Sequence, residues 1–151
     1  MQVWGLTDPG CVRKQNQDAY QIEQLDKSAV LCVVCDGMGG AKSGNIASTL
    51  AIDVFVQEIR RNWRSTLTQE KIDSILINAV KLANFTVFDQ AQQFEDFSGM
   101  GTTLVAVLIN GKNATFVNVG DSRAYRLRDG EFLQLSQDHV EKRPGREHLP
   151  G

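Results

Sequence analysis

The stretch "AVLCVVCDGMGGAKSG", residues 29–44, joins an apolar segment directly to an aspartate and a run of glycines. Its first seven residues are apolar at every position, which is typical of a central strand that is covered on both faces. Asp36 follows at the predicted strand end, and four glycines lie within the next eight residues. Three interpretations are open here: a nucleotide-binding loop, a metal site, or a turn without chemistry.

The spacing argues against a nucleotide-binding loop. In a P-loop, one glycine directly precedes the lysine and another lies five residues further upstream. Counting back from Lys42, these places hold Ala41 and Asp36. A dinucleotide-binding fingerprint that starts at Gly37 would need a glycine where Lys42 stands. The metal site and the simple turn therefore remain.

The chain as a whole has the composition of one folded domain. It has 151 residues, of which 42% are apolar and 23% are charged, and its formal net charge is −2. This charge favours neither a nucleic acid nor an anionic membrane as a partner. The N-terminus lacks the features of a secretion signal, no apolar run is long enough to span a membrane, and three cysteines do not suit a disulfide scaffold. We expect a cytoplasmic protein.

Hydrophobic periodicity predicts strands, then two helices, then strands again. The early strands are expected at 2–7, 19–25 and 29–35, and the helices at 44–63 and 68–93. Either Thr66 with Gln69, or Thr68 alone, would cap the second helix. Cys32 and Cys35 form a C-x-x-C pair, but side chains three apart in a strand point to opposite faces, so we expect no shared metal or disulfide.

Two hairpins are predicted after Gly101. Asn110-Gly111 separates the apolar runs 102–109 and 113–120, and Asp129-Gly130 separates 123–128 from 131–135. Such steps are the strongest short-range signal for a hairpin. The order of elements predicts an α+β fold in which helices pack on an antiparallel sheet. From residue 140 the periodicity is lost, which predicts a mobile tail or the start of a longer loop.

Charged residues near other predicted strand ends favour the metal site over the simple turn. Arg13 and Asp18 precede the strand at 19–25, and Asp121 follows another strand end. A hard divalent cation prefers carboxylate and carbonyl oxygens, and an arginine can bind two phosphate oxygens at once. Taken singly, each aspartate could equally cap a turn, and Arg13 could be a solvated surface side chain.

Five segments together resemble the metal-dependent Ser/Thr protein phosphatases of the type 2C family, and a bacterial member in particular. In chain order they are "TDPGCVRKQNQD" (7–18), "VVCDGMGG" (33–40), "GMGTTLVAVL" (99–108), "FVNVGDSRAYRL" (116–127) and "LSQDH" (135–139). The resemblance implies a β-sandwich flanked by helices, in α-β-β-α layers. Residues 1–139 would be the N-terminal part of that catalytic domain, and 140–151 a mobile tail or truncated flap region.

The resemblance also implies roles for particular residues. Asp36 would bridge two Mg²⁺ or Mn²⁺ ions, the Gly37 carbonyl would bind one of them, and Asp18 would hold metal-bound water. Asp121 would contribute to a third, weaker metal site in the complete domain. Arg13 would bind the substrate phosphate, so Arg13 and Asp36 are the expected catalytic residues. The implied reaction is hydrolysis of a phosphomonoester by metal-activated water.

The sequence departs from the family pattern in three places. Gln17 stands where many members have glutamate, and Met38 where many eukaryotic members have histidine. The two later aspartate motifs, which would supply ligands to one metal ion, do not occur after Asp138.

Two hypotheses follow from these departures. The chain is the N-terminal portion of a Mg²⁺- or Mn²⁺-dependent phosphoprotein phosphatase, or it is an inactive phosphatase-like fragment that binds a partner or is completed by one. The expected partners are a phosphoprotein substrate and a Ser/Thr kinase of the same pathway. Open sheet edges would also allow self-association.

Overall fold

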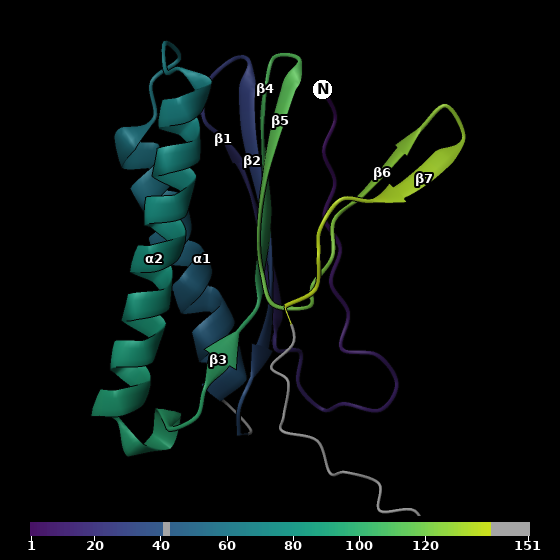
Figure 1. The fold of residues 1–151 in the computed structure, drawn as a ribbon. Helices are drawn as coiled ribbons and strands as arrows, with labels where there is room; N and C mark the ends of the chain where they lie inside the picture. The colour runs from purple at the N-terminus through teal and green to yellow at the C-terminus, as the bar shows by residue number, and fades with distance from the viewer. Residues whose placement is uncertain (41–42, 140–151) are drawn as a thin grey trace, which may run out of the picture.

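A pair of helices packs on one face of an antiparallel sheet in the computed structural model, which describes residues 1–40 and 43–139 (Figure 1). The five-stranded sheet has the order β1-β2-β4-β5, with β3 beside the end of β2. These strands are β1 (Asp18–Gln24), β2 (Ala29–Met38), β3 (Gly101–Thr102), β4 (Leu104–Asn110) and β5 (Asn113–Val119). The α+β prediction is confirmed.

The remaining elements lie on either side of this sheet. The helices are α1 (Ser43–Asn62) and α2 (Gln69–Gln93), followed by the short 3-10 helix η1 (Glu95–Phe97). The strands β6 (Tyr125–Arg128) and β7 (Glu131–Gln134) form a separate hairpin on the side of the main sheet opposite the helices (Figure 1). Of the four layers expected from the resemblance, the described residues therefore form a helix layer, one full sheet and a small second sheet.

The strand β2 is buried throughout on one face, while its other face is fully buried only at Val30, so the prediction of burial on both faces is wrong for most of the strand. Leu31, Val33 and Cys35 alternate toward the helices and are at most 1% exposed. Val34 points to the other face and is 46% exposed. Cys32 is half-buried on that same outer face, so the two cysteines do point in opposite directions. The outer face stays partly open because the described residues form no complete layer over it.

Both helices form within one residue of their predicted bounds. Small and apolar side chains face the core along each of them, including Ala47, Ala51 and Phe55 on α1. Of the two possible caps, Thr68 is the one used: its Oγ1 accepts a hydrogen bond of 3.3 Å from the Lys71 N–H. This contact satisfies one of the free N–H groups at the start of α2.

Both predicted hairpins are also confirmed. Asp129 and Gly130 both adopt positive φ, at 52° and 76°, as a two-residue turn with the twist of the flanking strands requires. Gly111 has a φ of 59° in the β4–β5 turn. The run predicted as one strand at 102–109 is interrupted at Thr103, which separates β3 from β4.

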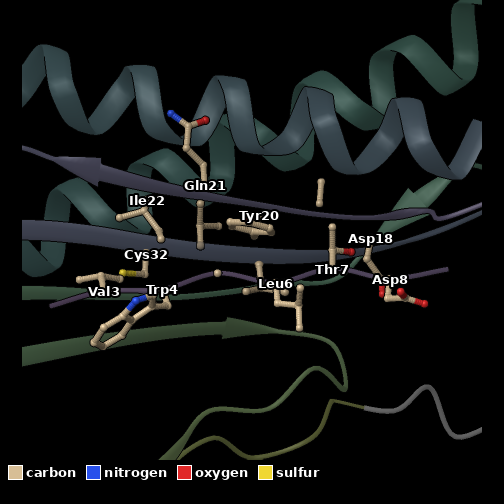
Figure 2. A pocket seen from close by; sticks show the side chains of 14 residues that line it. Val3, Trp4, Leu6, Thr7, Asp8, Asp18, Tyr20, Gln21, Ile22 and Cys32 are labelled. Carbon is tan, nitrogen blue, oxygen red and sulfur yellow. The ribbon is translucent and has the colours of Figure 1, made fainter. Parts of the chain in front are cut away.

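The prediction of an N-terminal strand at 2–7 is wrong. These residues cross the outer face of β1 and β2 instead, and a pocket of about 390 Å³ lies between them and the sheet (Figure 2). Gly5 lies directly against the Tyr20 ring, because a Cβ there would be 2.1 Å from the ring. A segment that lies over a sheet face has no neighbouring strand edge to hydrogen-bond with, so its alternating pattern cannot produce a strand.

Two further expectations concern the ends and the membrane. The mobile tail or truncated flap predicted at 140–151 lies outside the described residues. Among the helices that the structure describes, none is long and apolar enough to span a bilayer.

Candidate metal and phosphate site

Asp18 and Asp36 face each other across two neighbouring strands. Asp18 is the first residue of β1, and the antiparallel register pairs it directly with Asp36 near the end of β2. Directly opposed residues in such a pair project from the same face, with their Cβ atoms about 5 Å apart. The Asp18 N–H donates to Asn16 Oδ1 at 3.0 Å, which fixes the start of β1.

The surroundings of Asp36 raise the pKa of its carboxyl group. Partial burial of the carboxyl is the largest cause, followed by the hydrogen bond that its protonated form donates to the Asp18 carboxylate and by the negative charges of Asp18 and Asp121. The Arg13 guanidinium acts in the opposite direction. The structure thus brings three carboxylates and one arginine from distant parts of the chain close enough to influence one another.

Most of these groups line one open groove. Arg13, Asp36, Gly37 and Asp121 all lie along this groove, which has a volume of about 1700 Å³. Asp18 lies at the end of the smaller outer pocket, next to Asp8 (Figure 2). We call the end of the sheet that carries these residues the acidic rim.

Gly37 occupies a place that no larger residue could fill. Its N–H donates to the Gln17 carbonyl at 3.0 Å. A Cβ at this position would lie 2.0 Å from the Gly44 carbonyl oxygen and 2.8 Å from that of Gln17. The start of α1 therefore touches the backbone of β2 beside Asp36. Gln17, a departure from the family pattern, has a structural role in this contact because its side chain packs on Gly44.

Thr103 is a residue of the acidic rim that the sequence analysis did not identify. Its N–H donates to the Asp36 carbonyl at 2.9 Å, and its Oγ1 accepts from the Asp36 N–H, also at 2.9 Å. The same hydroxyl lies 2.5 Å from Ser122 Oγ, so it also reaches the neighbour of Asp121. The only signal in the sequence was a pair of threonines inside an otherwise apolar run.

The segment after β7 also reaches the groove. Asp138 and His139 both line it. The His139 N–H donates to the Gly120 carbonyl at 2.9 Å, directly before Asp121. Gly120 has a φ of 99°, a conformation that favours glycine at this point of the chain. For His139 the structure thus shows a backbone contact beside Asp121.

The donor groups of the acidic rim fit a hard divalent cation in part. Carboxylate and backbone carbonyl oxygens are the ligands that Mg²⁺ prefers, usually together with several waters. Within residues 1–40 and 43–139, however, no group of three His, Cys, Asp or Glu side chains is close enough to hold a metal ion by itself. The rim therefore offers part of a ligand shell, which water or further protein groups would complete.

Comparison with known proteins identifies the class of this fold and site. The sequence model of the protein phosphatase 2C family matches residues 12–145, and the chain belongs to this family.

Particular relatives support this assignment. The serine/threonine phosphatase stp of Listeria welshimeri is 34% identical over 136 residues, which cover 88% of this chain and 52% of that protein. The crystal structure of Stp1 from Staphylococcus aureus superposes with a TM-score of 0.81 at 36% identity, covering 89% of this chain and 52% of that one. The catalytic domain of the phosphatase PstP, solved in complex with two manganese ions, gives a TM-score of 0.69 at 35% identity, covering 87% and 53%. The chain thus spans about half the length of the relatives that it matches.

Proposed function

We propose that this chain carries the N-terminal half of the active site of a Mg²⁺- or Mn²⁺-dependent Ser/Thr phosphoprotein phosphatase. One observation carries the proposal: Arg13, Asp18 and Asp121 all act on the carboxyl group of Asp36 at one end of the sheet. This convergence occurs in a chain of the protein phosphatase 2C family.

The proposed roles follow from the chemistry of each group. Asp36 and the Gly37 carbonyl would bind a divalent cation, Asp18 would hold a water that belongs to it, and Asp121 would contribute to a further cation site. When bound, the cations supply an activated water and neutralise charge on the phosphate. Arg13 binds two phosphate oxygens through its planar guanidinium, which also orients the phosphorus for attack.

The charges of the rim explain why this site would need a cation to bind substrate. Three carboxylates stand against the single guanidinium of Arg13, so the rim as a whole repels a phosphate dianion. A divalent cation between the carboxylates would reverse the sign of the local field. Binding of phosphate, and not only its hydrolysis, should therefore depend on the metal.

The proposed reaction implies the class of partner, and the state of the cysteines indicates the compartment. The substrate is a phosphoprotein, which a Ser/Thr kinase must have formed. The three cysteines are free, and free thiols persist in a reducing compartment, which supports the cytoplasm.

The test is hydrolysis of p-nitrophenyl phosphate by the purified chain with Mn²⁺, with Mg²⁺ and with chelator. Any turnover should depend on metal, and Asp36→Asn should reduce it by about 100-fold or more, because removing a metal ligand costs at least as much as removing a residue that orients one. Asp53→Asn makes the same charge change on the exposed side of α1 and should leave turnover intact. A folded sample without turnover would overturn the claim that this chain is active on its own.

A second candidate function is that of an inactive module completed by another polypeptide. Cross-strand pairing places Ile22, Cys32, Val107 and Phe116 in one row on the outer face of the sheet. Phe116, at the edge strand β5, is 41% exposed. In this second candidate, the outer face and the edges of β1 and β5 would accept further strands from a second chain.

Light scattering coupled to size-exclusion chromatography separates the two candidates. The second candidate predicts a dimer or larger species without turnover, and Phe116→Ser should shift it toward monomer. A monomer with metal-dependent turnover would exclude it.

A further inference from the structure

The loop that carries Asp121 is tied to the segment that follows β7. The Leu135 N–H donates to the Ala124 carbonyl at 2.8 Å, and the Ala124 N–H donates to Ser136 Oγ at 2.9 Å. Asn118 Nδ2 donates to the Gln137 carbonyl at 2.9 Å. With the bond between His139 and Gly120 described above, these contacts run along both sides of Asp121. The two segments thus form one unit.

The one ion pair within this unit joins Arg123 to Asp138. Arg123 Nε donates to Asp138 Oδ1 at 3.0 Å, and Nη2 donates to Oδ2 at 2.7 Å, so the guanidinium binds the carboxylate in a fork. Tyr125 and Gln134 make longer contacts with the same pair, at 3.4 Å and 3.5 Å. The bidentate geometry specifies orientation as well as distance. The contact lowers the pKa of Asp138, so the pair remains ionised at neutral pH.

The position of this pair distinguishes it from an ordinary surface ion pair. Arg123 lies two residues after Asp121, and Asp138 directly precedes His139, whose N–H holds the carbonyl of Gly120. Asp138 itself lines the groove of the acidic rim. Any change that releases Asp138 would therefore free the backbone on the N-terminal side of Asp121.

We propose that Arg123 and Asp138 form a positioning pair that holds Asp121 at the acidic rim, in the place where it can act on a cation bound near Asp36. The proposal rests on the proposed function for its metal. Both residues would act through the position of Asp121 and not through direct contact with the cation or the phosphate. Residues that orient a metal ligand typically change metal affinity by 10–100-fold when removed, and a partly exposed pair belongs at the low end of that range.

The experiment compares four variants of the full chain: Arg123→Gln, Asp138→Asn, the double variant, and Arg126→Gln as a control. Arg126 lies on the exposed β6 strand and does not line the groove. Mn²⁺ binding is measured by EPR of the free ion, and hydrogen exchange is measured at the Ala124 and His139 amides. Arg123→Lys keeps the charge but loses the bidentate geometry, and it replaces the neutral variants in both measurements if they do not fold.

We expect both single variants and the double variant to weaken Mn²⁺ binding about tenfold and to a similar extent, because either change alone removes the whole pair. The two amides should exchange faster in all three, and Arg126→Gln should match the wild type in both measurements. Unchanged exchange would overturn the proposal, and so would faster exchange with unchanged Mn²⁺ affinity, since the pair would then only stabilise the hairpin. A wild type that binds no Mn²⁺ would overturn the proposed function, while faster exchange in the variants would still support the positioning of the loop.

Discussion

Thr103 lies directly opposite Asp36, and its side chain takes over a hydrogen bond that normally belongs to the backbone. The strand β2 pairs with β3 and β4 in one continuous register, which places these two residues across from each other. In a regular ladder the Asp36 N–H would donate to the Thr103 carbonyl. It donates to Thr103 Oγ1 instead, and the Thr103 carbonyl accepts from Thr102 Oγ1 at 2.9 Å. The Thr103 hydroxyl thus holds the backbone of Asp36, and the Thr102 hydroxyl satisfies the Thr103 carbonyl, at the point where the sheet is interrupted.

Replacing Thr103 by valine should destabilise the fold. The shapes are nearly the same, but valine leaves the Asp36 N–H and the Ser122 hydroxyl without their partner. We expect a loss of about 1–2 kcal/mol in the free energy of unfolding, measured by urea denaturation. Thr103→Ser keeps the hydroxyl and should recover most of this loss. A valine variant as stable as the wild type would show that water replaces the hydroxyl.

Replacing Gly37 by alanine should be more damaging. The added Cβ would lie 2.0 Å from a carbonyl oxygen of α1, and backbone atoms cannot move aside as a flexible side chain can. We expect a loss of about 3 kcal/mol or more in the free energy of unfolding. Gly40→Ala is the matched control, because its Cβ would meet nothing closer than 4.0 Å. Equal stability of the two variants would contradict the close approach of α1 to β2.

The elements that the sequence predicted well are those whose signals are local. The helices, the two hairpin turns and the Thr68 cap depend on periodicity or on residues a few positions apart. The prediction of a strand at 2–7 failed because a strand needs a neighbouring strand to pair with, and the alternating pattern does not show whether one is present. The prediction that β2 is buried on both faces failed for the same reason, since such burial depends on a layer that other parts of a chain must supply.

The candidate site divides in a similar way. Asp18, Asp36 and Asp121 were expected to meet because each stands at a strand end, and the structure brings them together. Thr103 and the pair of Arg123 with Asp138 could not be inferred, because their contacts join positions that only the folded chain brings close. Their roles depend on side-chain geometry, about which hydrophobic periodicity gives no information.

Replacing Trp63 by phenylalanine should reduce stability at neutral pH. It should also make stability less sensitive to a fall in pH. Trp63 Nε1 donates to Asp26 Oδ2 at 2.7 Å, and this bond is the main cause of the lowered pKa of Asp26. A lowered pKa contributes stability that is present above the usual value of 3.8 and is lost as the pH falls through the folded-state value.

We expect the phenylalanine variant to have a Tm about 3 °C lower at pH 7, with a smaller difference near pH 2.5. The control is Trp4→Phe, since Trp4 is 79% exposed and should not affect Tm at either pH. A difference between Trp63→Phe and the wild type that stays constant from pH 7 to about pH 2.5 would mean that only packing, and not the bond to Asp26, is lost.

Replacing Asp36 by asparagine should stabilise the metal-free chain while it abolishes the response to metal. Burial, Asp18 and Asp121 raise the pKa of Asp36, so the folded chain holds this proton more tightly than the unfolded chain does. Stability is then lost as the pH rises from the usual value of 3.8 through the raised folded-state value, and at pH 7 the full cost is present. Asparagine avoids this cost. Because Asp36 is exposed, solvent screens the effect, and we expect a Tm only about 1 °C above wild type in chelator at pH 7.

The difference between Asp36→Asn and the wild type should disappear below about pH 3.8, where Asp36 is protonated in both states. Mn²⁺ should reverse the order at pH 7, because a cation that binds only the folded wild type raises its Tm and leaves that of the asparagine variant unchanged. Thermal unfolding with Mn²⁺ and with chelator, at both pH values, measures all three effects. Asp53→Asn should follow the wild type in every condition. If the wild type is instead the more stable protein in chelator at pH 7, the carboxylates of the rim do not repel one another. The proposal that they need a cation to neutralise them would then be wrong.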